Sequence, residues 1–411
     1  PIAQVGLHLG GIVRAEHILG DGAAVGEQTR SRLPSHALEH AVGRRDILRV
    51  LILAVQIAVG QADVGADIQR VRRIHIFERV VGLDEEHVDL VIIGGGFAYF
   101  LPQNVPGSKR KDNKNYVEMF QKEGYALATS NTELSKAVKG NPDKLLGLFH
   151  TGNMDGVLDR KFLKKGTVSK FPDQPDLTDS MRAALSVLSK NPEGFFLMLE
   201  AGLVDKYSHP LDWERAVYDT IMFDKVVAIA QEFCDKNPDT LLIVTGDHTH
   251  SISVIGTVDD NLPGELLPGP YRFMDRIFDE LIGIYAEAGY PAYKDRNGDG
   301  YPDDVNVSKR LAVFIGNSPD YYETYRPKMD GPFVPSVKDE KGHYIANAAY
   351  KDVPGAQLRI GNLPRTESTG VHSIDDLVVG ARGPHADAFR GFMNSTEVFR
   401  IMSEALALGN K

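Results

Sequence analysis

The chain has 411 residues, of which 42% are hydrophobic and 25% are charged, and these proportions are those of an ordinary globular protein. Its net charge of −10 argues against a general nucleic-acid binder. Only one cysteine, Cys234, is present, so no intrachain disulfide can form, and no apolar run of about 18 residues predicts a membrane span.

Residues 1–87 differ in composition from the rest of the chain. They contain ten arginines but no lysine, asparagine, tyrosine or methionine, and the first lysine of the chain is Lys109. We hypothesise that much of this segment is not native to the protein, through a shifted reading frame, a mis-joined fragment or an unrelated fusion. The alternative is a divergent arginine-rich domain. Resequencing the gene across position 88 distinguishes the two.

From residue 88 to residue 256, short apolar runs alternate with helical patterns, as in a mostly parallel α/β sheet flanked by helices. Three glycines at 94–96 close the first strand, and without a G-x-G-x-x-G pattern they indicate a plain turn instead of a phosphate-binding loop. We expect strands at 88–93, 144–150, 195–199 and 240–245, and helices at 113–123, 131–139, 176–190 and from 213 to the Asn-Pro pair at 237–238.

Possible metal ligands follow two of these strands and recur near the C-terminus. Strand, helix and strand between 195 and 245 form a βαβ unit, whose strand ends meet at one edge of a sheet. Imidazole together with carboxylate suits zinc, and carboxylate with water suits magnesium. The predicted ligands are Glu200, Asp205 and His209 after the first strand, Asp247 and His248 after the second, and His372.

Residues 257–364 are rich in Pro, Gly, Asn, Asp and Tyr, which predicts an inserted, loop-rich subdomain. Within it, oxygen-bearing residues stand at positions one, three, five and nine of a loop with glycine at position six, a spacing typical of calcium loops. Position twelve is Asn306 where an EF-hand has glutamate, so an Asp/Asn-rich turn is the alternative. The tentative calcium ligands are Asp295, Asn297, Asp299, Tyr301 and Asp303.

Residues 365–411 are expected to return to the core. The apolar run at 377–379 predicts a strand, Arg382 is interpreted as part of a turn, and 396–408 predicts a closing helix.

Five motifs in order give the chain, from about residue 88 to residue 411, a resemblance to the alkaline phosphatase family. The motifs lie at 88–96, 144–149 and 195–209, at 245–250 (Thr-Gly-Asp-His-Thr-His), and at 370–372 leading to Ala-Arg-Gly-Pro at 381–384. The resemblance implies a three-layer α/β sandwich and hydrolysis of phosphate monoesters through a phosphoserine. It also implies two zinc ions, one magnesium ion and a periplasmic or secreted homodimer.

The resemblance also assigns roles to the predicted ligands. Asp205, His209 and His372 would hold one zinc, and Glu200 would bind magnesium. Asp247 and His248 would hold the second zinc together with a nucleophilic serine. The remaining histidines of interest, His150, His250 and His343, are interpreted as structural, with orientation of a neighbouring ligand as a further option for His250.

The catalytic nucleophile stays unknown at this stage. The family's Asp-Ser-Ala motif is missing from the sequence, and Asp21 in a Gly-Asp-Gly triplet only partly resembles the family's first metal aspartate. Two alternatives therefore remain open: a metal-binding module without turnover, and another activity of the same superfamily, such as phosphodiester, phosphonate or sulfate ester hydrolysis.

Overall fold

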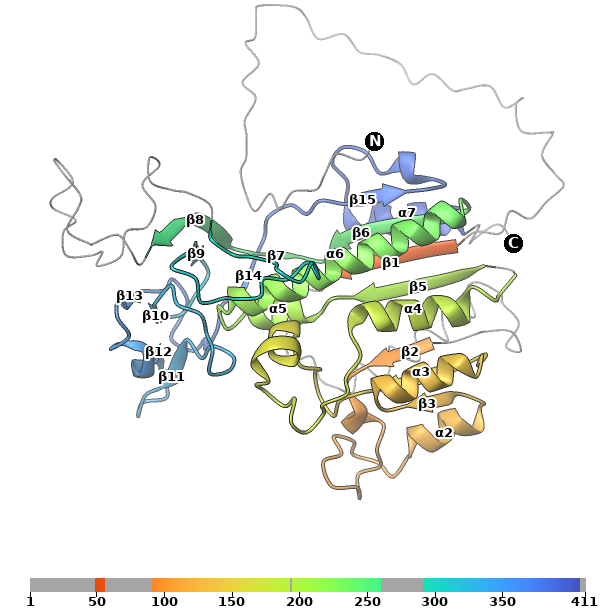
Figure 1. The fold of residues 1–411 in the computed structure, drawn as a ribbon, viewed down its shortest axis with the longest axis horizontal. Coiled ribbons are helices and arrows are strands. Elements are labelled where there is room, and N and C mark those ends of the chain that lie inside the picture. Colours follow the sequence, from red (N-terminus) through yellow and green to blue (C-terminus); the bar gives the residue numbers. More distant parts are fainter. Residues whose placement is uncertain (1–48, 56–90, 193, 260–290, 407–411) are drawn as a thin grey trace, which may run out of the picture. The chain divides into compact units, whose positions relative to one another are not determined.

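A computed structural model describes residues 49–55, 91–192, 194–259 and 291–406, all of which belong to one compact unit, residues 48–411 (Figure 1). None of the helices in these ranges has the length and apolar character that a bilayer crossing requires.

The main sheet has four strands in the order β15-β6-β1-β5. Strands β1 (Arg49–Val55), β5 (Phe195–Glu200) and β6 (Thr240–Gly246) run parallel, and the short β15 (Gly380–Arg382) pairs antiparallel with β6. The predicted βαβ unit is present, but β1 lies between its two strands. Because all three strands are parallel, the ends of β5 and β6 open onto the same edge, as the sequence predicted.

Helices pack on both faces of this sheet (Figure 1). On one face, α4 (Leu177–Leu188) and α6 (Trp213–Lys236) form a core with Leu197, Leu199 and Leu242. On the other face, Leu241 and Ile243 pack with α7 (Ser395–Ala405), because alternate strand residues point to opposite sides. The predicted helices at 176–190, 213–236 and 396–408 are therefore present within a few residues.

A second, smaller sheet has the order β2-β4-β3, with all three strands parallel. It consists of β2 (Val91–Gly94), β3 (Ala126–Ala128) and β4 (Leu145–Leu148), with α2 (Tyr116–Lys122) and α3 (Asn131–Lys139) beside it. Leu145, Leu146 and Leu148 are almost fully buried, which explains why the apolar run at 144–150 identified this strand correctly.

The glycine turn after β2 is closed by backbone pairing. The amides of Gly96, Phe97 and Ala98 donate to the carbonyls of Gly152, His150 and Thr151 at 2.9–3.1 Å. These amides are therefore not directed at a ligand, in agreement with the predicted plain turn.

Close packing at this turn leads to a test of stability. A Cβ on Gly95 would lie 2.2 Å from the carbonyl oxygen of Gly152, whereas a Cβ on Gly94 meets no atom within 4 Å. We expect Gly95→Ala to lower the free energy of unfolding by about 1–3 kcal/mol and Gly94→Ala to change it far less, as measured by urea denaturation. Equal effects of the two substitutions would contradict this account of the turn.

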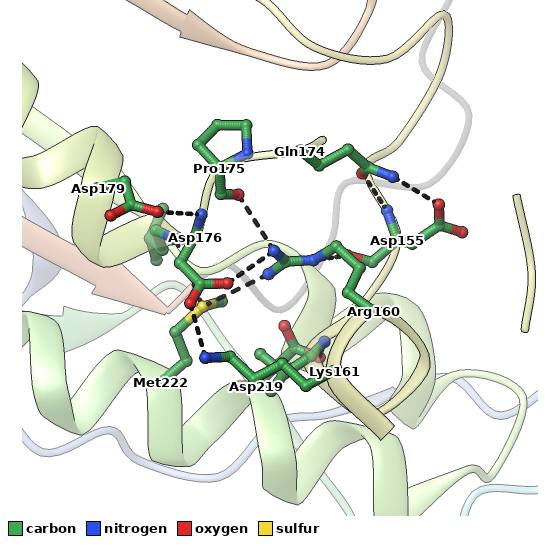
Figure 2. Close-up of polar contacts among 12 residues, drawn as sticks. Asp155, Arg160, Lys161, Gln174, Pro175, Asp176, Asp179, Asp219 and Met222 are labelled. Atoms are coloured by element: carbon green, nitrogen blue, oxygen red, sulfur yellow. Dashed lines mark hydrogen bonds and ion pairs between the residues drawn. The ribbon is translucent and has the colours of Figure 1, made fainter. Parts of the chain in front are cut away.

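The connection from β4 to α4 contains a π-helix, η2 (Leu158–Leu163), and is held by Arg160 (Figure 2). The Arg160 guanidinium donates to Asp176 Oδ1 at 2.6 Å, to the Asp155 carbonyl at 2.8 Å and to the Pro175 carbonyl at 3.2 Å. Burial opposes the charge of Asp176, but Arg160 and Lys161 hold the pKa of that carboxyl below its usual value. The same carboxyl group begins α4 through a capping box with Asp179.

Short antiparallel strand pairs lie within and on either side of the region 257–364, which was predicted as a loop-rich insertion. The longest pair is β8 (Ile252–Asp259) with β9 (Lys309–Ile315). The remaining short pairs are β7 (Thr249–His250) with β14 (His372–Ser373), β10 (Tyr321–Glu323) with β13 (Gln357–Arg359), and β11 (Ser336–Lys338) with β12 (Tyr344–Ala346). Single-turn 3₁₀ helices occur at Phe97–Tyr99, Ala348–Tyr350 and Ala386–Ala388, and a short α-helix, α5, occurs at Leu203–Ser208.

Two expectations near the C-terminus are wrong. Residues 377–379 have no regular structure, and Val378 is 87% exposed, so their apolar character does not reflect burial in a strand. The strand begins at Gly380, where the backbone pairs with Val244 of β6. Arg382, interpreted as a turn residue, lies in β15 and forms an ion pair with Asp235.

Glu214 at the start of α6 is a buried acid whose Oε2 has no hydrogen-bond partner among the described residues. Burial raises the pKa of Glu214 from 4.5 to about 8, with Lys328 opposing and Asp212 and Glu323 reinforcing the shift. Between these two pH values the folded chain holds a proton that the unfolded chain has released. The contribution of Glu214 to stability is therefore lost as pH rises through this window.

Replacing this acid should flatten the pH dependence of stability. Between about pH 4.5 and about pH 8, the free energy of unfolding of the unmodified chain should fall by on the order of a few kcal/mol because of Glu214. We expect this fall to be absent in Glu214→Gln. Urea midpoints measured at several pH values, with metal chelated, test this. Glu232→Gln, on the exposed side of α6, is the control and should retain the original slope. An unchanged slope in Glu214→Gln would contradict the assignment.

Candidate metal centre

Four side chains from three elements meet at the carboxyl edge of the main sheet. Asp205 lies in α5, and His209 directly follows that helix, one turn further along. His250 and His372 are cross-strand partners in the β7–β14 pair. One ligand atom from each of the four residues lies within 4.8 Å of the others, and no other such group occurs in the described ranges.

The carboxylate of Asp205 is the centre of this group and is fully buried. Its Oδ1 lies 2.7 Å from His250 Nε2, 3.2 Å from His209 Nε2 and 3.8 Å from His372 Nε2. Its Oδ2 has no hydrogen-bond partner among the described residues and lies 3.5 Å from Lys206 Nζ. A buried carboxylate with one unpartnered oxygen is costly unless a cation compensates its charge.

The imidazole of His209 is held in one tautomer. Its Nδ1 donates to the carbonyl of Gly370 at 2.7 Å, so the lone pair is left on Nε2, which faces Asp205 and His372. The Nε2 atoms of His209 and His372 are 3.2 Å apart. Two imidazole nitrogens and a carboxylate at this spacing are a donor set that zinc accepts, so the residues present fit the metal.

His372 is kept neutral by its surroundings. Burial, together with the neighbouring His248, His209 and His250, lowers the pKa of His372 to about 4, and Asp205 opposes this shift. The neutral imidazole is the form that binds a metal, so no proton has to leave His372 near neutral pH.

The remaining predicted ligands lie outside this four-residue group. His248 stacks on His372, with ring centroids 3.4 Å apart and the planes at 22°, and so borders the group directly. His248 Nε2 lies 3.9 Å from Asp247 Oδ2, and Glu200 ends strand β5 at the same edge of the sheet. The assignment of these three residues to a second and a third metal stays a prediction.

Sequence reasoning gave His250 a structural role and missed that it belongs to the group. A signal was present, because His248 and His250 are two residues apart in an extended segment and therefore share a face. The cross-strand pairing with His372, 122 positions later, has no counterpart in local sequence. The contact between His250 and Asp205 supports the option that His250 orients a ligand.

His150 and His343 lie outside the group, as expected of structural histidines. Both ring nitrogens of His150 are occupied, by Thr167 Oγ1 at 2.7 Å and by the amide of Gly152 at 2.9 Å. His343 Nδ1 lies 3.8 Å from Asp339 in an exposed turn.

The loop predicted to bind calcium is ordered by its own side chains. The Asp295 carboxylate accepts the amides of Gly298, Asp299 and Gly300 at 2.8–3.2 Å. Asn297 Nδ2 donates to Asp303 at 3.1 Å, and the buried ring of Tyr301 stacks on Tyr218 of α6. The loop is therefore anchored to the core through Tyr301, and calcium binding by it stays a prediction.

Comparison with known proteins agrees with this fold and site. A family model described as alkaline phosphatase matches residues 58–408, beginning thirty residues before the stretch in which motifs were recognised. The chain belongs to the alkaline phosphatase family, a family of metal-dependent phosphomonoesterases.

Individual relatives differ in how much of their length this chain spans. It is 25% identical to an alkaline phosphatase of Gadus morhua over 410 residues, covering 94% of this chain and 70% of the relative. It is 35% identical to alkaline phosphatase 4 of Bacillus subtilis (strain 168) over 326 residues, covering 78% of this chain and 58% of the relative. The crystal structure of Thermus thermophilus alkaline phosphatase shares the fold, with a TM-score of 0.50, 22% identity and coverage of 89% and 72%.

The hypothesis that residues 1–87 are not native to the protein stays a prediction. Within this segment, β1 pairs in register with β5 and β6, and the family match begins at residue 58. The candidate metal aspartate Asp21 lies outside the described residues.

Proposed function

We propose that this chain hydrolyses phosphate monoesters at a metal centre built on Asp205, His209 and His372. The observation that carries the proposal is the buried Asp205 carboxylate with three imidazoles around it. Its second oxygen has no hydrogen-bond partner among the described residues, and Lys206 Nζ lies 3.5 Å from it. Membership of the alkaline phosphatase family supports the substrate class.

The proposal assigns the remaining predicted ligands as the family resemblance does. Asp247 and His248 contribute to a second zinc, and Glu200 binds magnesium. When bound, such ions offset the charge of the phosphate group and lower the pKa of an attacking oxygen. The protein residues hold the donor atoms in place: Gly370 fixes the tautomer of His209, His250 orients Asp205, and His248 lies flat against His372.

Elemental analysis together with p-nitrophenyl phosphate hydrolysis tests this function. The expected result is zinc near two per chain with turnover. His372→Ala should lose turnover and the zinc that it binds, whereas the exposed control His343→Ala should retain both. A preference for bis(p-nitrophenyl) phosphate would instead indicate a phosphodiesterase of the same superfamily.

A second candidate function is a metal-binding module without turnover. The observation that favours it is that the sequence lacks the family's Asp-Ser-Ala motif, so that no nucleophile is assigned. Zinc binding that depends on His372, without hydrolysis of either ester, would support this candidate over the enzyme.

Further properties implied by the family are part of the proposal. These are a three-layer sandwich, a homodimer and a periplasmic or secreted location. The proposal also includes a calcium ion in the loop at 295–304, which comes from the residue spacing of the loop and not from the family. The spacing of oxygen ligands supports the calcium ion, and calorimetric titration with calcium tests it. Sedimentation analysis tests the homodimer.

A further inference from the structure

His372 lies in a segment with little regular structure of its own. The strand β14 has two residues and pairs only with the equally short β7. Residues 374–379 that follow have no regular structure, and Ile374 is fully exposed. The position of this ligand must therefore be fixed by contacts from elsewhere in the fold.

Asn317, two residues after the end of β9, supplies two of these contacts. Its carbonyl accepts the amide of Val371 at 3.1 Å, and its side-chain Nδ2 donates to the carbonyl of His372 itself at 3.1 Å. Asn317 thus bonds both to the backbone amide of the residue before His372 and to the backbone carbonyl of His372.

The side chain and backbone of Asn317 are themselves held in place. Asn362 Nδ2 donates to Asn317 Oδ1 at 3.3 Å, which directs Nδ2 of Asn317 toward His372. The amide of Asn317 donates to Ser251 Oγ at 2.7 Å, and Ser251 directly follows His250. Asn317 therefore connects the segment that carries His372 with the segment that carries His248 and His250.

A further pair of bonds connects the same segment to His209. The amide of Gly370 donates to the carbonyl of His209 at 2.7 Å, and the Gly370 carbonyl accepts from His209 Nδ1. A Cβ on Gly370 would lie 3.1 Å from the carbonyl of Asn317 and 3.3 Å from that of His209, so the three backbones are in close contact.

We propose that Asn317 is a positioning residue for the metal centre: by holding the backbone of His372, it sets the distance of this imidazole from His209 and Asp205. The inference rests on the proposed function, because it assumes that His372 binds a metal. Asn317 touches neither metal nor substrate and acts through the main chain of His372.

The test substitutes Asn317→Asp, which keeps the shape but places a carboxylate oxygen where Nδ2 donates. The control is Asn347→Asp. Asn347 Nδ2 likewise donates to a backbone carbonyl, that of Val334, at 2.9 Å, but in the described part of the chain neither residue bonds to a predicted metal ligand. Each full-length variant is titrated with cobalt(II) as the probe, following its visible absorption bands, and with zinc against a chelator. Urea midpoints are measured with metal chelated.

We expect Asn317→Asp to weaken zinc affinity about 10–100-fold and to shift the cobalt bands, which report ligand geometry, whereas Asn347→Asp changes neither. Asn362→Ala, which removes the bond that orients the Asn317 amide, should change affinity in the same direction by a smaller factor. This second variant decides the question if Asn317→Asp does not fold.

Unaltered cobalt bands and zinc affinity in Asn317→Asp would overturn the inference. The inference would also fail if Asn317→Asp lowered the urea midpoint and the affinity together while Asn362→Ala changed neither, since Asn317 would then be purely structural. Failure of the metal centre itself gives a different result, because the unmodified chain would then bind neither cobalt nor zinc. Failure of hydrolysis alone is seen when the unmodified chain binds zinc but does not cleave p-nitrophenyl phosphate, and the metal titrations of the variants still decide the role of Asn317.

Discussion

Asp205→Asn is expected to abolish specific zinc binding and, with it, any hydrolysis of phosphate monoesters. The substitution keeps the size of the side chain but removes the negative charge that offsets the cation. It also replaces one carboxylate oxygen with an amide group that cannot coordinate through its nitrogen. We expect zinc affinity to fall by more than about 100-fold. Losing a residue that only supports a ligand typically lowers metal affinity by about 10–100-fold.

The stability of this variant distinguishes a metal ligand from a structural carboxylate. With metal chelated, Asp205→Asn should be at least as stable as the unmodified chain, because it no longer buries a charge with an unpartnered oxygen. With zinc added, the unmodified chain should gain stability in proportion to zinc concentration and the variant should not. Thermal unfolding with and without zinc measures both effects.

Asp224→Asn is the matched control, since Asp224 is exposed on α6. It should bind zinc and respond to it as the unmodified chain does. Retention of zinc-dependent stabilisation and turnover in Asp205→Asn would contradict the assignment of Asp205 as a ligand.

The sequence was most informative where local periodicity decides the structure. The apolar runs of β5 and β6 correctly predicted that the residues after them lie at one sheet edge. The helix α5, which places Asp205 and His209 on one side of a helical turn, was not among the predicted elements. His372 was a candidate ligand from its own sequence, but its grouping with Asp205 and His209 came only from family resemblance, because no local pattern connects it with residues more than 120 positions earlier.

The parts that sequence did not predict depend on long-range pairing. Local pattern gave no sign that β1 would lie between β5 and β6, and β15 was assigned to the wrong residues because its register is set by pairing with β6. The contact of His250 with Asp205 and the hydrogen bond from Asn317 to the His372 carbonyl depend on the short β7–β14 pair. Two-residue strands leave almost no periodicity to read.

Arg215→Met is expected to produce the largest loss of stability among the substitutions considered. Arg215 is fully buried and holds Asp159 through two bonds of 2.8 and 2.9 Å. It also donates to Asp212 Oδ2 at 2.9 Å and to the carbonyl of Lys328 at 2.8 Å. Burial opposes its charge, but hydrogen bonds and charge interactions with Asp159 and Asp212 hold the pKa of Arg215 above its usual value.

Removing this guanidinium takes away the counter-charge that both Asp159 and Asp212 contact directly, and these two carboxyl groups are each no more than 1% exposed. Breaking a buried ion pair in this way costs about 3–5 kcal/mol. Arg215→Lys should retain part of the stability, because it keeps the charge but cannot bond Asp159 with two parallel donors. Adding Asp159→Asn to Arg215→Met should recover part of the loss, because one of the stranded charges is then removed.

Urea denaturation with metal chelated measures these differences without a contribution from metal binding. The control is Arg400→Met, since Arg400 forms its ion pairs with Glu397 and Glu404 on the exposed side of α7 and should change the midpoint little. If Arg215→Met shifted the urea midpoint as little as Arg400→Met does, the buried charges would be compensated in another way. If the loss is as large as expected, Arg215 is the residue that holds together η2, the start of α6 and the segment that contains Lys328.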